Sequence, residues 1–94
     1  MPEKQEFKNT MEDQLKEWKE KMERARIRAA TAPPEEREYY REKFEQLSDQ
    51  YETARYKFSL LKAGSADAWD ELRDGFEKAF AEFRKGFEKA MKKL

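Results

Sequence analysis

Carboxylates are the main residues of this 94-residue chain that could serve catalysis or metal binding, because the chain has no His and no Cys. The commonest general base and the commonest metal ligand are therefore both missing, and neither a thiolate site nor a disulfide can form. A metal site in a helical bundle normally needs inward-facing Glu-x-x-His motifs, whereas the Glu residues here fall on polar helix faces. We expect no metal, no cofactor, no catalytic residue and no enzymatic activity.

The charge balance limits the partners. The 21 Lys and Arg residues equal the 21 Asp and Glu residues, so no net field attracts nucleic acid or an anionic membrane surface. The opening stretch, residues 1–6, has no apolar run typical of a signal peptide, and no later run is long enough to span a bilayer. We expect a soluble, cytoplasmic protein that binds neither nucleic acid nor a small-molecule substrate.

Small residues at helical spacing are the first candidates for recognition. Gly75 with Ala79, and Gly86 with Ala90, form two small-xxx-small pairs that are eleven residues apart. A glycine inside a soluble helix costs about 1 kcal/mol relative to alanine, so some contact should offset that cost. Two interpretations stay open. The glycines let helices of one chain approach closely or leave room for an indole ring, or they form a docking groove for another chain.

A second candidate contact consists of two exposed apolar residues. Tyr56 and Leu60 are four residues apart on the helix face opposite to the apolar seam of their segment, and Ile27 is similarly placed in an earlier segment. Single exposed apolar residues are ordinary in soluble proteins. The pair Tyr56 and Leu60 is nevertheless a candidate contact with another subunit.

Helices must position these residues, and the apolar periodicity predicts three of them, at about 3–30, 34–62 and 66–93. In the first two segments the apolar residues recur at steps of three and four, which is helical spacing, and the second is an unbroken heptad pattern. The apolar positions are Phe7, Met11, Leu15, Trp18, Met22, Ala25 and Ala29 in the first segment, and Tyr40, Phe44, Leu47, Tyr51, Ala54, Phe58 and Leu61 in the second.

The third segment repeats an eleven-residue unit, at 68–78 and again at 79–89, and a third copy begins at Ala90. Eleven residues are close to three helical turns, so equivalent positions return to nearly the same face. The resulting rows are Trp69, Phe80 and Met91, then Leu72, Phe83 and Leu94, then Phe76 and Phe87. Together they predict one apolar seam.

Two short turns separate the segments. Pro33 and Pro34 cannot continue a helix but suit the start of the next one. We expect Gly64 to take the left-handed conformation after the second helix and Ser65 to cap the third. Because short turns join helices of similar length, neighbours should be antiparallel.

The prediction is therefore an all-α fold, an antiparallel up-down-up three-helix bundle or coiled coil, with residues 1–94 in a single domain. The turns disfavour a long dimeric zipper. A two-helix hairpin whose third helix dimerises stays open as the alternative. The predicted core contains Trp18, Phe44, Tyr51, Phe58, Trp69, Phe76, Phe80, Phe83 and Phe87.

The segment 68–72 (Ala-Trp-Asp-Glu-Leu), the following 75–80 (Gly-Phe-Glu-Lys-Ala-Phe) and the charged helix around 15–18 (Leu-Lys-Glu-Trp) resemble a loose family of small bacterial coiled-coil proteins with tandem Ala-Trp-x-x-Leu repeats. The resemblance implies a soluble, all-helical protein associated with stress conditions and without catalytic residues. The phenylalanine-rich second repeat and the proline pair depart from the family pattern.

Together these observations predict a non-enzymatic helical scaffold or protein-interaction subunit that docks through helix faces onto a larger assembly or onto itself. The alternative is a stress-protective or lipid-surface-binding protein whose third helix can open and expose its phenylalanine seam. The polar face of that helix carries seven acidic and seven basic residues, whereas helices that lie on lipid surfaces usually favour Lys and Arg there.

Overall fold

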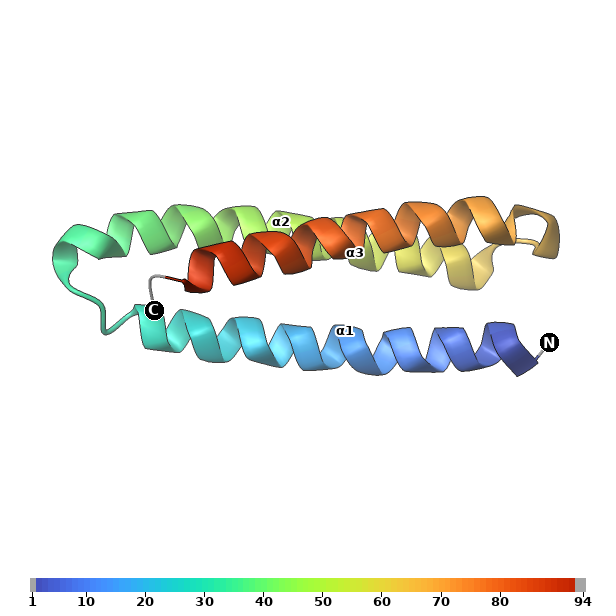
Figure 1. Ribbon diagram of the computed structural model, residues 1–94, viewed down its shortest axis with the longest axis horizontal. Coiled ribbons are helices and arrows are strands. Elements are labelled where there is room, and N and C mark those ends of the chain that lie inside the picture. Colours follow the sequence, from blue (N-terminus) through green and yellow to red (C-terminus); the bar gives the residue numbers. More distant parts are fainter. Residues whose placement is uncertain (1, 93–94) are drawn as a thin grey trace.

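The computed structural model describes residues 2–92, and helices account for nearly all of them (Figure 1). Helix α1 spans Pro2–Ala29, α2 spans Pro34–Ala63, a short 3-10 helix η1 spans Ala66–Ala68, and α3 spans Trp69–Met91. The described residues contain no strand, and the prediction of an all-α fold is confirmed. The predicted end of the third helix at residue 93, and Leu94, lie outside the described residues.

The three helices lie along one long axis in an up-down-up arrangement (Figure 1). Helix α2 runs opposite to α1, and α3 turns back along α2, so that α1 and α3 point in the same direction. The rod that they form measures 50 × 18 × 18 Å. The narrow cross-section means that the bundle has one continuous core along its length.

Helices α2 and α3 supply most of that core. All seven heptad positions of α2 are buried, as predicted. From α3, Phe76 and Phe83 are completely inaccessible to solvent. The ring of Phe76 lies 5.2 Å from that of Phe58 on α2 and 5.5 Å from that of Phe80, measured between centroids. The aromatic seam predicted for the third segment thus forms the centre of the α2–α3 pair.

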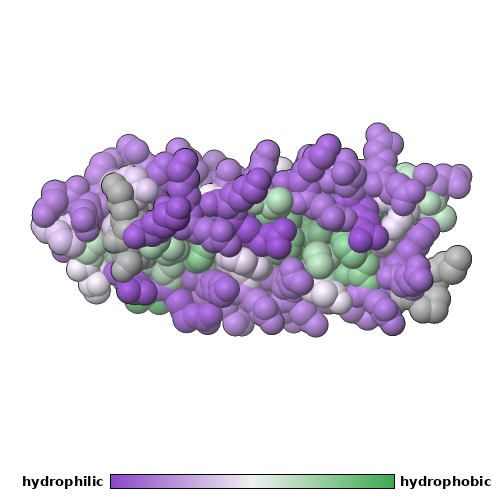
Figure 2. Space-filling view, in the orientation of Figure 1, coloured by the Kyte–Doolittle hydropathy of each residue, from purple (hydrophilic) through white to green (hydrophobic). Residues whose placement is uncertain are grey.

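Helix α1 is held less closely than the other two. Its buried residues are Leu15, Met22, Ala25 and Ala29, whereas its aromatic residues Phe7 and Trp18 are only partly buried. Trp18 makes an edge-to-face contact with Phe87 of α3, with 5.3 Å between the centroids. Figure 2 shows apolar residues along the middle of this face, between rows of polar ones. Trp18 and Phe87, predicted as core residues, therefore lie at the rim of the core.

The two turns differ from each other in how well they follow the prediction. Pro33 has an extended backbone, with φ −55° and ψ 147°, and Pro34 begins α2 as expected. The predicted left-handed conformation of Gly64 is wrong, because its φ is −73° and its ψ is 161°. The predicted cap is also wrong, since the Ser65 side chain makes no capping hydrogen bond.

Space, and not backbone conformation, explains the glycine at position 64. A Cβ atom there would collide with Cδ1 of Leu72 and would lie 3.0 Å from the carbonyl oxygen of Leu60. The chain then enters α3 through η1, in which the Ala68 amide donates to the Ser65 carbonyl at 3.2 Å. Helix α3 consequently begins at Trp69, three residues later than predicted.

One buried hydrogen bond ties α1 to α2. The hydroxyl of Tyr51 donates to the carbonyl oxygen of Leu15 at 3.0 Å. We predict that Tyr51→Phe lowers the free energy of unfolding by about 0.5–1.5 kcal/mol, the usual net contribution of such a bond. Urea unfolding followed by circular dichroism measures the change. Tyr56→Phe is the matched control, because the exposed Tyr56 side chain should tolerate the change within about 0.5 kcal/mol. Equal unfolding midpoints for the two variants would contradict the prediction.

Candidate functional site

The predicted row of small residues on α3 faces two different environments. Ala79 and Ala90 are buried, with 8% and 1% of their surface exposed. They pack inside the chain, so their side chains offer no surface to a partner in this fold. Only the two glycines of the row are partly accessible.

The two glycines have different surroundings. A Cβ atom at Gly86 would lie 3.0 Å from Oε1 of Gln50 and 3.3 Å from Cδ2 of Leu47, both on α2. Gly86 therefore lets α2 and α3 approach closely, and its nearest neighbours include no indole ring. At Gly75, by contrast, an added Cβ atom would meet no described atom within 4 Å. Of the two, Gly75 alone leaves open space beside α3.

The outer face of α2 carries the other predicted contact residues. Tyr56 is 63% exposed and Leu60 is 39% exposed, one helical turn apart. The ring contact between Phe58 and Phe76 shows how α2 and α3 are aligned along the rod axis. In that alignment Gly75 of α3 lies at about the same height along the axis as Leu60 of α2. Tyr56 and Leu60 nevertheless lie on the face of α2 that is turned away from α3, so the structure brings together only these two of the six predicted contact residues, which we call the outer patch.

Ile27 is the most exposed large apolar residue that the described chain contains, at 69%. It lies near the C-terminal end of α1, close to the first turn, whereas the outer patch lies towards the second turn. Ile27 is therefore a separate, single exposed residue, and it serves below as a control position.

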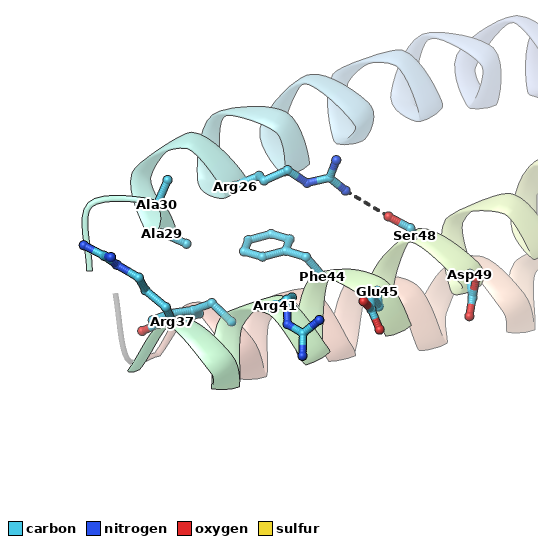
Figure 3. Close-up of a pocket in the computed structure, with 10 residues that line it drawn as sticks. Arg26, Ala29, Ala30, Arg37, Arg41, Phe44, Glu45, Ser48 and Asp49 are labelled. Atoms are coloured by element: carbon cyan, nitrogen blue, oxygen red, sulfur yellow. Dashed lines mark hydrogen bonds between the residues drawn. The ribbon is translucent and has the colours of Figure 1, made fainter. Parts of the chain in front are cut away.

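An open groove of about 750 Å³ lies between the last turns of α1 and the first turns of α2 (Figure 3). The ring of Phe44 projects from α2 towards α1, and Ala29 lies across from it on α1. Arg26 reaches from α1 and donates to the Ser48 hydroxyl at 3.0 Å. The groove therefore has an apolar floor with a cation at its side.

The other charged residues of this groove point in two directions (Figure 3). Arg37 extends towards the turn, where its Nε donates to the carbonyl oxygen of Ala32 at 2.9 Å. Arg41, in contrast, points away from α1 and binds the carboxylate of Glu38. Hydrogen bonding to Arg41 holds the pKa of the Glu38 carboxyl below its usual value. Arg37 and Arg41 thus differ in their orientation although they are one turn apart.

Tyr40 also lines the groove, and its hydroxyl is unusual. The residue is 2% exposed, yet its hydroxyl oxygen has no hydrogen-bond partner among residues 2–92. Burial raises the pKa of Tyr40, and the negative charge of Glu36 raises it further. An unpaired buried hydroxyl costs about 1–3 kcal/mol of folding free energy.

The partly buried rings of the bundle are covered by cations. The guanidinium of Arg73 lies 4.2 Å from the ring centroid of Phe7, and the ammonium of Lys21 lies 4.5 Å from that of Trp18. Such cation–π contacts contribute about 0.5–1 kcal/mol at exposed sites. The long Lys and Arg side chains thus shield the aromatic rim while keeping their charges in water.

Metal ligands and membrane-spanning helices were sought in the part of the chain that the structure describes. It contains no group of three or more Asp and Glu side chains placed to hold a metal ion. None of its helices has an apolar stretch long enough to cross a bilayer. A scan against protein-family models and searches of curated proteins and of solved structures find no match for the chain. Membership of the coiled-coil family that it resembles stays a prediction.

Sequence reasoning identified the outer patch but missed the groove. The groove arises because small residues, Ala29 and Ala30, line its α1 side, where larger side chains would fill the space beside Phe44. In the sequence, its trace is the run of arginines before the proline pair. Nothing in the periodicity indicates that these arginines lie near Arg37 and Tyr40 on the other side of the turn.

The contrast between the two glycines gives a test. Gly75→Ala should raise the free energy of unfolding by about 0.5–1 kcal/mol, because it improves helix propensity and meets no neighbour. Gly86→Ala should bring no such gain, because Leu47 and Gln50 must move to admit the methyl group. Urea unfolding of both variants measures the difference. An equal gain at both positions would show that Gly86 is not needed for close packing.

Proposed function

We propose that the protein is a non-enzymatic helical scaffold that docks through a helix face onto a second copy of itself. The observation that carries the proposal is the outer patch. Tyr56 and Leu60 are adjacent and exposed on a chain whose predicted seams otherwise pack against one another within the bundle. A zero net charge supports it further, because two copies do not repel each other at long range.

A dimer with its two-fold axis at the outer face of α2 would bury both Tyr56 and Leu60. If two α2 helices meet antiparallel, Tyr56 of each copy lies on Leu60 of the other, which is the reciprocal contact of an isologous dimer. A patch of this size buries far less than the 1,200–2,000 Å² or so of a standard interface, so the association is weak and reversible.

A helix of a larger assembly is the other occupant that such a patch can accept. It would use the same two side chains as anchors, in the manner of helix recognition by apolar residues at spacings of three and four. The experiment below separates the two occupants, because only self-docking changes the mass of the purified chain.

A lipid-surface role is a second candidate, and one observation favours a modified form of it. Opening α3 would expose Phe76 and Phe83, which are completely buried. Helix α1 is the one held loosely, and its Phe7 and Trp18 are already partly exposed, next to the cations of Arg73 and Lys21 respectively. We therefore assign any opening to α1 instead of the third helix. Co-sedimentation with anionic vesicles tests this candidate, and absence of binding would exclude it.

Light scattering over a range of concentrations tests self-docking. We expect the average mass of the wild-type chain to rise above the monomer mass of 11.4 kDa as concentration increases. The double variant Tyr56→Ser/Leu60→Ser should stay at the monomer mass, because it removes both apolar contacts. Ile27→Ser is the matched control, since it replaces an apolar residue outside the patch that is at least as exposed as Tyr56 and Leu60. That control should associate like the wild type.

Two results would contradict self-docking. One is a wild-type chain that stays monomeric at every concentration. The other is a double variant that associates as strongly as Ile27→Ser. In the first case, purified baits of the wild type and of the double variant would be compared for partners that only the wild type retains.

A further inference from the structure

The face of the rod on which α1 and α3 lie side by side, the α1–α3 face, is apolar along its seam and only partly covered. Figure 1 shows α1 and α3 running in the same direction, and Figure 2 shows apolar residues between the polar rows of this face. The partly buried apolar residues that α1 and α3 contribute here are Phe7, Met11, Trp18, Phe87 and Met91. The α1–α3 face therefore keeps apolar surface in contact with water along the rod.

The charges of α1 and α3 are sorted by sign along the rod. Residues 2–15 and 66–79, which form the start of α1, η1 and the start of α3, carry nine carboxylates and four cations. Residues 16–29 and 80–92, the second halves of the same two helices, carry ten cations and five carboxylates. Because the two helices point the same way, their gradients add (Figure 1). The rod thus has an acidic end near the second turn and a basic end near the first, although the net charge of the chain is zero.

Helix dipoles account for only part of this separation. Carboxylates at the start of a helix and cations at its end are stabilising, but the effect falls off within the first and last turns. Asp13 and Glu77 at the acidic end, and Lys21 and Arg84 at the basic end, lie well inside their helices. Helix α2 runs the other way with seven carboxylates and six cations, so it does not cancel the gradient.

On each helix one row of exposed residues at steps of four and three changes from acidic to basic. The α1 row is Glu6, Thr10, Asp13, Glu17, Lys21, Arg24 and Arg28, and the α3 row is Asp70, Asp74, Glu77, Ala81, Lys85, Glu88 and Lys92. Such spacing keeps each row on one side of its helix. The basic part of the α1 row lines a crevice against Phe87 and Met91 of α3, so this row borders the seam.

The α3 row also borders the seam, at the acidic end. Its Glu77 accepts a hydrogen bond from Nε of Arg73 at 2.6 Å, and the Arg73 guanidinium lies over the ring of Phe7 on α1. Lys4 and Lys8, two more of the four cations at this end, lie over the ring of Trp69. The cations of the acidic end thus cover rings, whereas its carboxylates outnumber them and face water.

A second copy of the chain matches both ends of this face. When one copy is turned end for end, its basic end lies on the acidic end of the other, and a two-fold axis repeats the same contact. A face 50 Å long and 18 Å wide offers room for the burial of about 800 Å² per partner that a standard interface needs. A membrane of anionic lipids or a nucleic acid, by contrast, matches the basic end alone and is repelled by the acidic end.

We propose that the α1–α3 face is an antiparallel interface with a second copy of the chain. Opposite charges meet at both ends of the interface, and the half-buried rings of the two seams cover one another between them. This face is separate from the outer patch on α2 and goes beyond it, because it makes the rod self-complementary on a second side.

Salt separates the two self-contacts. At about 0.5 M salt the Debye length is only a few ångströms, so the α1–α3 contact should be lost while the apolar outer patch is not weakened. The outer patch is therefore tested at high salt. The α1–α3 face is tested at about 0.02 M salt in the variant Tyr56→Ser/Leu60→Ser, so that failure of one contact does not hide the other.

Light scattering of this variant over a range of concentrations is the first measurement. At low salt its average mass should rise towards twice the monomer mass of 11.4 kDa, and at about 0.5 M salt it should return to the monomer mass. A mass that stays monomeric at low salt, or that does not respond to salt, would overturn the proposal. If the monomeric chain sediments with phosphatidylglycerol vesicles, the basic end belongs to a lipid surface instead.

Charge reversal then locates the interface. In the same variant, an acid-reversed chain carries Glu6→Lys/Asp13→Lys/Asp70→Lys, and a base-reversed chain carries Arg24→Glu/Lys85→Glu/Lys92→Glu; all six residues are exposed. Each chain alone should be monomeric at low salt, because like charges then meet at both ends. An equal mixture should form a mixed dimer. Self-association of either chain as strong as that of the parent variant, or a mixture that stays monomeric, would contradict the assignment.

A matched control separates position from net charge. Glu42→Lys/Glu45→Lys/Asp49→Lys changes the net charge as much as the acid-reversed chain does, but its three residues are exposed on α2. Mixed with the base-reversed chain, this control should associate at least about tenfold more weakly than the acid-reversed chain does. Equal association would mean that net charge alone, and not the α1–α3 face, brings the copies together.

Discussion

The packing of the α3 phenylalanines into the α2 seam is the interaction on which the rest of the bundle depends. Phe76 and Phe83 are completely buried and contact Phe58 and Tyr51 of α2 at 5.2 and 5.5 Å between ring centroids. Burying an aromatic side chain contributes about 1.5–3 kcal/mol, so these contacts make a large apolar contribution to the stability of the fold. Gly86 permits them, because its missing side chain lets the two helices approach. The α2–α3 hairpin is the platform on which α1 lies.

Sequence periodicity predicted this platform well, because it depends on a repeating chemical pattern. The heptads of α2 and the eleven-residue rows of α3 specify both faces, and the prolines at 33 and 34 specify one turn. Conformation at Gly64 and capping by Ser65 were predicted wrongly, since glycine there serves the contact with Leu72, which depends on tertiary packing. The backbone and capping preferences of individual residues do not reveal such a contact.

The candidate sites also differ in how well the sequence predicts them, because some depend on a pattern within one helix and others on contacts between helices. Tyr56 and Leu60 stand out because they break the polar pattern of one helix. The different roles of Gly75 and Gly86 are hidden, because the repeat makes them equivalent while the neighbouring helix does not. The groove at Phe44 depends on small residues of α1 opposite arginine and tyrosine of α2, a combination that exists only after the chain has turned.

The Tyr51 hydroxyl has a consequence for the axial register of α1. Apart from tyrosines, no residue with a polar or charged side chain is buried in the described chain, and buried polar groups are what commonly fix how helices are aligned along their axes. Apolar residues at steps of three and four present similar faces after each repeat, so shape alone separates one alignment of α1 from its neighbours only weakly. The bond from Tyr51 to the Leu15 carbonyl is a directional contact at the centre of that helix. Sliding α1 along the α2–α3 pair would break this bond, so the Tyr51 hydroxyl favours the observed longitudinal position of α1.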